Sequence, residues 1–143
     1  MTATTAVRYE QAIPDIFQAM NGVHAAMESH GLDRKLQHLV RLRASQINGC
    51  AFCIKMHIRE AREDGETNDR IDRVIVWNHV SDFTDAEKAA LAWTEALTAI
   101  DGKTDLGALR ARLRQHYSEE QIGVLTANIA VINFWNRFQV SRH

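Results

Sequence analysis

The sequence predicts an all-α fold, and three observations support that prediction. Apolar residues recur mostly at intervals of three and four, the spacing of one face of a helix. Runs that alternate β-branched with polar residues, which would indicate strands, are absent from the sequence. The chain contains one proline, Pro14, and only seven glycines, so few positions interrupt a helix. Its 143 residues are enough for one core, and we expect a single domain over residues 1–143.

Capping signals divide the first half of the chain into helices joined by short turns. The first helix is expected to open at Pro14, where a missing N–H costs little, and to stop near Gly31. Asp33 is the expected cap of the second helix, which Asn48 and Gly49 break. A third helix is expected to follow at once, from about residue 50 to residue 64.

The second half of the chain carries the same kind of signal. Thr67 is the expected cap of a short fourth helix, and Thr84 with Glu87 forms a capping box for a fifth. Leucines at 106, 109 and 113 mark a short sixth helix. Ser118 with Gln121 forms a second capping box for a last, long helix. We therefore expect a helical bundle of about six to seven helices.

The last helix, from about residue 119 to residue 138, is apolar on nearly every side. A helix of this kind must be buried all round, and a domain this small can surround it only partly. The pattern favours a homo-oligomer in which a second subunit covers the remainder, the alternative being a central core helix in a monomer. The polar residues of this helix, Asn133, Asn136 and Arg137, need partners if buried, and a network across an interface is the simplest account.

Composition limits the classes of partner and the compartment. The formal net charge is −1, which gives no reason to expect a nucleic-acid or anionic-membrane partner. No apolar run approaches the roughly 20 residues of a transmembrane helix, and the first residues do not resemble a secretory signal. We expect a cytoplasmic protein. In that reducing compartment, a purely structural disulfide is a poor explanation for the two cysteines, Cys50 and Cys53.

Cys50 and Cys53 form a Cys-x-x-Cys pair directly after the predicted helix break. The first turn of a helix offers unpaired N–H groups and the positive end of the helix dipole, which lower the pKa of a cysteine. Residues three apart share a helix face, so the sulfurs can come within disulfide reach. His57 lies four residues after Cys53, one turn along the same face, where it can act as a base.

This arrangement predicts a redox cycle. One thiolate attacks an electrophilic oxygen and becomes a sulfenic acid, and the second cysteine condenses with it to give a disulfide. An external dithiol then restores the pair by thiol–disulfide exchange. We assign Cys53, beside His57, as the attacking thiolate. Cys50 is expected to be the more exposed of the two and to be the resolving thiol that meets the reductant.

Three other interpretations of the cysteine pair are open. A zinc site would have Cys50, Cys53 and His57 as three ligands. There is no second cysteine pair to complete four, so the fourth ligand would be His38 or another histidine brought close by folding. Two buried, inert cysteines are also possible. A thioredoxin-like site requires a strand before the motif, whereas the preceding residues are predicted to be helical. Glu60, three residues after His57, could orient that histidine or be a solvated partner of nearby arginines.

The residues around the pair resemble a known family. The stretch 39–57 closely resembles the core motif of the AhpD-like alkylhydroperoxidases, within the carboxymuconolactone decarboxylase superfamily, and segments 83–96 and 132–137 agree with it. The resemblance implies an all-α fold, homo-oligomers that are often trimers or hexamers, and peroxide reduction without a metal or organic cofactor. It implies that Cys53 is the peroxidatic cysteine, Cys50 its redox partner and His57 the histidine of a proton relay.

Two positions depart from the family pattern. His38 stands where the family commonly has a glutamate, twelve residues before the first cysteine, and Phe52 stands where some members have a histidine. We expect both to affect the rate of turnover more than the identity of the thiol pair. The predicted function is a thiol-dependent peroxidase with a hydroperoxide substrate and a dithiol electron donor. The alternative is a redox-sensing dithiol–disulfide module with little turnover. Lactone decarboxylation is disfavoured because that branch of the superfamily lacks the pair.

Overall fold

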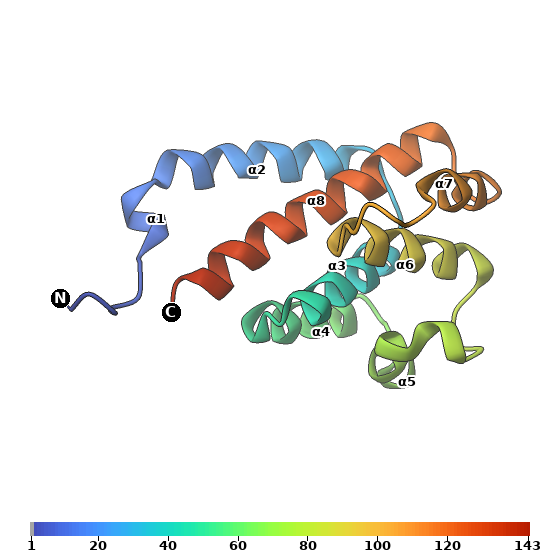
Figure 1. Ribbon diagram of the computed structural model, residues 1–143, viewed down its shortest axis with the longest axis horizontal. Helices are drawn as coiled ribbons and strands as arrows, with labels where there is room; N and C mark the ends of the chain where they lie inside the picture. The colour runs from blue at the N-terminus through green and yellow to red at the C-terminus, as the bar shows by residue number, and fades with distance from the viewer. Residues whose placement is uncertain (1) are drawn as a thin grey trace.

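The computed structural model describes residues 2–143, and within them the regular structure is entirely helical (Figure 1). The elements are α1 (Tyr9–Ala12), α2 (Pro14–Ser29), α3 (Arg34–Asn48), α4 (Ala51–Glu63), α5 (Asn68–Arg73), the 3₁₀ helix η1 (Val74–His79), α6 (Asp85–Thr98), α7 (Leu106–Arg114) and α8 (Glu119–Ser141). The predicted all-α class is confirmed. In the part of the chain that the structure describes, none of the helices is both long and apolar enough to cross a membrane.

Helix α3 is the centre of the molecule and packs against α4, α6 and α8. Its apolar residues point two ways because their spacing places them on two stripes. Leu36 and Val40 join a cluster with α6, α7 and α8, whereas Leu39 and Leu42 join a second cluster with α4, α5, η1 and α6. A helix packed on both sides is held firmly, and α3 is therefore the fixed support against which α4 presents the cysteine pair.

The predicted starts of the helices are confirmed by their caps. Pro14 occupies the first position of α2, and Asp33 and Thr67 accept backbone N–H groups at the starts of α3 and α5. Complete capping boxes open α6 at Thr84 and α8 at Ser118. These signals were visible in the sequence because each depends on side chains only two or three residues apart.

Two local features differ from the sequence expectation. The described residues contain the additional short helix α1, which has no side-chain cap and no buried residue, so the sequence carried no signal for it. The predicted fourth helix is divided: α5 ends at Arg73 and η1 continues, with a non-helical backbone at Val76 (φ −118°, ψ 27°). The β-branched run Val74, Ile75 and Val76 explains the break, because such side chains crowd the preceding turn.

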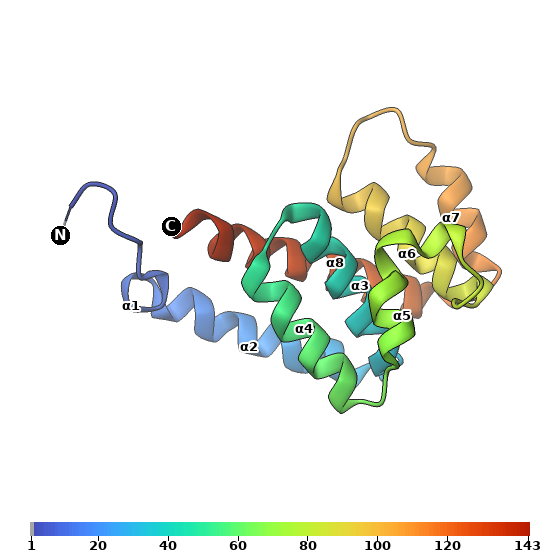
Figure 2. The ribbon, with the colours of Figure 1, turned by 90° about the horizontal axis from the view of Figure 1, so that it is seen from below.

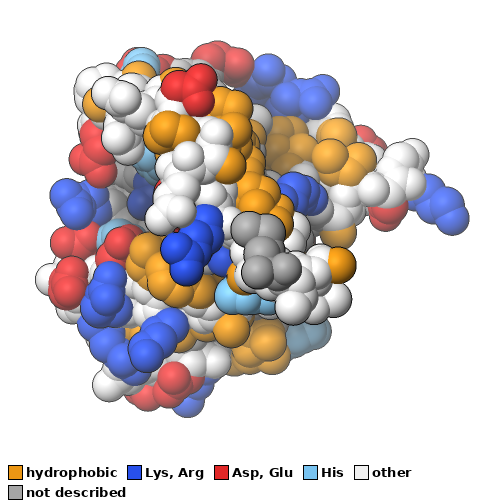
Figure 3. Space-filling view, turned by 90° about the vertical axis from the view of Figure 1, so that its left-hand side faces the viewer, with side chains coloured by type: hydrophobic (Ala, Val, Ile, Leu, Met, Phe, Trp, Pro, Cys, Tyr) orange, Lys and Arg blue, Asp and Glu red, His pale blue; other side chains and the backbone are white. Residues whose placement is uncertain are grey.

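Helix α8 runs the length of the molecule, and α2 lies along it at the edge of the fold (Figures 1 and 2). One chain covers α8 only partly: Ile129 and Ile132 are buried, whereas Val140 is 51% exposed. Of the sixteen residues of α2, only Met27 is buried. Figure 3 views the end at which both termini lie, where hydrophobic side chains form a band interrupted by lysine and arginine side chains.

Candidate active site

The cysteine pair lies at the turn between α3 and α4, and the backbone of that turn depends on Gly49. Gly49 adopts φ 67°, a left-handed conformation that favours glycine. Its N–H donates to the carbonyl of Gln46, and the N–H of Cys50 donates to the carbonyl of Ser45, which closes the end of α3. The break predicted at Asn48 and Gly49 is confirmed, and it brings Cys50 to the start of the next helix.

Cys50 and Cys53 are joined by a disulfide, with their Cα atoms 5.3 Å apart. Cys50 is the N-cap of α4, and its sulfur accepts a hydrogen bond from the backbone N–H of Cys53 at 3.2 Å. Both sulfurs therefore lie at the N-terminal end of α4, where unpaired N–H groups stabilise negative charge. The structure represents the oxidised state of the pair.

The sequence predicts that Cys50 is the more exposed cysteine, but exposure does not distinguish the two because both are buried. Cys50 is 2% exposed and Cys53 is 1% exposed. As the N-cap, Cys50 turns its side chain over the first turn of α4 instead of out to solvent. The two residues between the cysteines, Ala51 and Phe52, are exposed, and Phe52 is 60% exposed.

The two cysteines nevertheless border different cavities. Cys53 lines a pocket of about 360 Å³ between α2, α3, α4 and α8. Cys50 lines a wider hollow of about 680 Å³ at the end of α8, beside Glu10 and Arg142. Phe52 lines both cavities and stands between them. The two cysteines of the disulfide thus face separate cavities.

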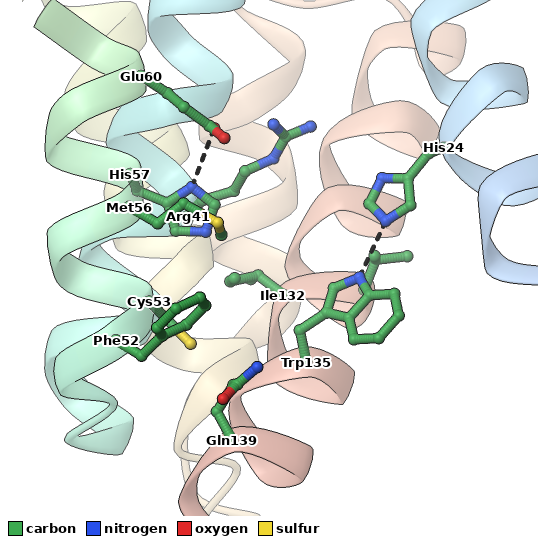
Figure 4. Close-up of a pocket in the computed structure, with 11 residues that line it drawn as sticks. His24, Arg41, Phe52, Cys53, Met56, His57, Glu60, Ile132, Trp135 and Gln139 are labelled. Carbon is green, nitrogen blue, oxygen red and sulfur yellow. Dashed lines mark hydrogen bonds and ion pairs between the residues drawn. The ribbon is translucent and has the colours of Figure 1, made fainter. Parts of the chain in front are cut away.

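The pocket beside Cys53 has an apolar wall and a polar end (Figure 4). Its side chains come from four helices and were brought together only by folding. They are His24 from α2; Arg41 from α3; Phe52, Cys53, Met56, His57 and Glu60 from α4; and Val131, Ile132, Trp135 and Gln139 from α8. The apolar wall favours the organic part of a ligand, and the polar end lies above the sulfur.

His57 occupies the polar end of the pocket, one turn along α4 from Cys53 (Figure 4). It is 4% exposed, and neither ring nitrogen has a hydrogen-bond partner. Burial lowers the pKa of His57, and the nearby Glu60 carboxylate partly opposes that effect. A buried, neutral imidazole whose ring nitrogens make no hydrogen bond is suited to accept a proton from a neighbouring thiol.

Glu60 lies close to His57, at 3.5 Å between its Oε2 and the His57 Nδ1. This contact is an ion-pair distance when His57 is protonated, although it is too long for a good hydrogen bond. The interaction with His57 lowers the pKa of the Glu60 carboxyl, against the opposing effect of burial. The three-residue spacing was the sequence signal for this pairing.

His38 does not approach the sulfurs in the way a fourth zinc ligand would. Its Nε2 is 2.5 Å from Asp64 Oδ2, and its Nδ1 is 3.9 Å from Glu60 Oε2. Arg34 also donates to Asp64, at 3.0 Å. Within residues 2–143, no group of three or more histidine, cysteine or acidic side chains has an arrangement that could hold a metal ion.

Two further residues of the pocket were not found from the sequence. His24 Nε2 accepts a hydrogen bond from the indole N–H of Trp135 at 2.9 Å, and burial lowers the pKa of His24. Arg41 donates to Asn128 at 2.7 Å and to Gln37 at 2.9 Å. Gln37 lies one turn before Arg41 on α3, but Trp135 and Asn128 lie on α8, far along the chain, so no spacing in the sequence could indicate those two contacts.

The polar residues of α8 find partners inside the same chain. Asn48 donates to Asn133 and to Asn136, both at 2.9 Å, and Asn136 donates to Ser45 at 3.1 Å. Arg137 donates to the Asn133 side chain at 2.9 Å. A network across a subunit interface is therefore not needed to explain them. The network fixes the end of α3 against α8, directly before the cysteine turn.

A helical domain with a disulfide-bonded Cys-x-x-Cys pair at the N-terminus of α4 defines the class of this protein. The chain belongs to the carboxymuconolactone decarboxylase family, whose model matches residues 14–96. Within that superfamily it is AhpD-like. It is 39% identical to ATU0492 of Agrobacterium tumefaciens, a protein of unknown function described as a candidate antioxidant defence protein AhpD. The two structures superpose with a TM-score of 0.89, covering 96% of this chain and 94% of that one.

Other relatives agree with this placement. The uncharacterized protein YdfG of Bacillus subtilis is 38% identical, over 94% of this chain and 92% of its own length. The uncharacterized protein YnjA of Escherichia coli is 30% identical, over 92% of this chain and 73% of its own length. The debrominase Bmp8 has a TM-score of 0.82 at 22% identity, covering 92% of this chain and 71% of that one. At that identity the likeness to Bmp8 concerns the fold.

Proposed function

We propose that the protein is a thiol-dependent peroxidase that reduces organic hydroperoxides through Cys53 and Cys50. The observation that carries the proposal is the Cys50–Cys53 disulfide at the start of α4, with Cys53 bordering a pocket that also contains His57. The apolar wall of that pocket suits the organic group of the hydroperoxide. His57 acts as the proton carrier of the site.

Each step of the proposed cycle conserves atoms and electrons. The Cys53 thiolate attacks the terminal oxygen of the hydroperoxide, the O–O bond breaks, and the alkoxide takes the proton held by His57 and leaves as an alcohol. Cys53 is now a sulfenic acid. The Cys50 thiol condenses with it, which forms the disulfide and releases water. A dithiol donor then supplies two electrons and two protons and becomes a disulfide itself.

The two cavities support a division of labour between the cysteines. The hydroperoxide would enter the pocket beside Cys53, and the donor would attack Cys50 from the hollow at the end of α8. Attack on Cys50 releases Cys53 as the leaving thiolate, close to His57, and so regenerates the species that begins the next cycle.

A second candidate function is a redox-sensing module in which the pair changes state without efficient turnover. The observation that favours it is the burial of both sulfurs, at 2% and 1% exposed, because thiol–disulfide exchange requires access to a sulfur. In that case oxidation would be readily observed, whereas catalytic recycling by a dithiol would not.

The test is steady-state reduction of cumene hydroperoxide with dihydrolipoamide or a thioredoxin as donor. We expect wild-type turnover to be lost in Cys53→Ser and His57→Gln to lower kcat/KM by about 100-fold, the usual contribution of a positioned acid–base group. His116→Gln is the matched control, because His116 is an exposed histidine away from the pocket. Unchanged turnover in Cys53→Ser would refute the assignment. Disulfide formation without recycling by either donor would favour the sensing module.

A further inference from the structure

The carboxylate that the family motif places on α3 is absent from this chain, where His38 occupies that position. The pocket nevertheless contains a carboxylate in contact with the site histidine. Glu60 approaches His57 from the next turn of α4, at 3.5 Å from its Nδ1 (Figure 4). Helix α4 itself therefore supplies a carboxylate beside the imidazole of His57.

Glu60 stands between two buried histidines. Its Oε2 is 3.5 Å from the Nδ1 of His57 and 3.9 Å from the Nδ1 of His38, and neither nitrogen has a hydrogen-bond partner. His38 is held in this orientation by its other ring nitrogen, which is bonded to Asp64. His38 therefore forms the far wall of the Glu60 position.

The remaining charges around His57 and Glu60 favour this arrangement. Arg41 of α3 faces both groups, and its positive charge stabilises the carboxylate but disfavours an unaccompanied imidazolium. Helix α2 contributes His24, whose Nε2 accepts a hydrogen bond from the indole N–H of Trp135. The residues that α8 places in the pocket carry no charge. Glu60 is consequently the anion in contact with His57, apart from the Cys53 thiolate itself.

We propose that Glu60 is the positioning carboxylate of the thiol site, acting through His57 to hold Cys53 as a thiolate. This inference deepens the proposed function and rests on its assignment of Cys53 and His57. When the Cys53 thiol gives its proton to His57, the buried imidazolium would be costly without an anion beside it. The Glu60 carboxylate offsets that cost, and the stored proton remains available for the departing alkoxide.

The thiolate of Cys53 can be measured without any peroxide. In a Cys50→Ser background Cys53 is the one cysteine of the chain. Below the pH range in which tyrosines ionise, the ultraviolet absorbance of the thiolate therefore reports the ionisation of Cys53. We expect Glu60→Gln, which keeps the shape and removes the charge, to raise the apparent pKa by about one unit. That shift means about ten-fold less thiolate at a pH well below the pKa.

Two comparisons make the measurement specific. Glu63→Gln is the matched control, because Glu63 is an exposed carboxylate on the same helix whose partner is Arg59, and its titration should coincide with the parent. Adding Glu60→Gln to His57→Gln should produce no further shift, since Glu60 acts through that histidine. Glu60→Asp should recover part of the lost thiolate.

Two outcomes would overturn the inference. A Glu60→Gln curve that coincides with the parent would show that the carboxylate does not influence the thiol. A full shift that persists without His57 would show that Glu60 acts by another route. Neither outcome depends on peroxide turnover, so a protein that titrates as expected but does not reduce hydroperoxides would refute the proposed function and leave the role of Glu60 intact.

Discussion

At the scale of single residues, the chemistry of the site depends on how burial and charge are balanced around His57. Burial lowers its pKa, and the Glu60 carboxylate opposes that effect. Asp64 is the C-cap of α4, and its hydrogen bond with His38 lowers the pKa of the Asp64 carboxyl. The two carboxylates thus lie on either side of His38, which separates them.

This arrangement predicts the effect of restoring a glutamate at position 38. In His38→Glu, a third carboxylate would lie beside Glu60 and Asp64. The hydrogen bond between the imidazole and Asp64 would also be lost. Like charges this close cannot all remain ionised. We expect kcat/KM for cumene hydroperoxide to fall by roughly ten-fold and the protein to be less stable above neutral pH. His38→Gln, which adds no charge, is the comparison in the same assay. A rise in the activity of His38→Glu would show instead that the histidine at this position lowers peroxidase activity relative to a glutamate.

Some residues of the site could be placed together from the sequence, and others could not. Cys50, Cys53, His57 and Glu60 share one helix, so their spacing was enough to place them together. His24 and Arg41 enter the pocket through the packing of α2 and α3, which no local pattern encodes. The burial of Cys50 was missed for a related reason, because the expected exposure assumed that a helix start faces solvent.

At the scale of elements, the α3–α4 turn determines where the cysteine pair lies. The Gly49 backbone is left-handed, and the Asn48 network ties the end of α3 to α8. The sequence predicted this break and most of the helix caps, since glycines and capping side chains act over a few residues. It did not predict α1, which has neither a cap nor a buried face. It also missed the change to a 3₁₀ helix at Val74.

Two alanine substitutions separate the backbone role of Gly49 from the space around it. A Cβ would meet nothing within 4 Å at either Gly49 or Gly123, but only Gly49 has a positive φ. We expect Gly49→Ala to lower the free energy of unfolding by roughly 1 kcal/mol, because alanine is strained in that conformation. Gly123→Ala, inside α8, should raise it by roughly 0.5–1 kcal/mol. Urea unfolding measures both, and equal effects would contradict the account of the turn.

At the scale of the whole molecule, most of helix α2 is exposed to solvent in the single chain. It packs along α8, and Ile16 and Val23 on its apolar stripe are 44% and 39% exposed. An apolar helix with one buried residue is more stable when a second surface covers it. We expect a second copy of the same chain to cover it. The sequence favours the same arrangement, because the last helix is apolar on nearly every side.

The oligomer is tested directly by analytical ultracentrifugation. We expect the wild-type protein to sediment as a trimer or hexamer and Val23→Glu to dissociate it, because a buried unpaired charge at an interface costs several kcal/mol. Asn21→Glu, which places the same charge on another side of α2, should leave the mass unchanged. A wild-type protein with the mass of a single chain would contradict this expectation.

The central claim is that Cys53 reduces a hydroperoxide and is then resolved by Cys50. Its most direct test is a single-turnover measurement on the reduced protein with cumene hydroperoxide and no donor. The account predicts one equivalent of alcohol per chain, formed together with one Cys50–Cys53 disulfide, whereas Cys50→Ser should stop with Cys53 as a sulfenic acid. Formation of the alcohol without oxidation of Cys53, or no reaction of the reduced pair, would contradict it.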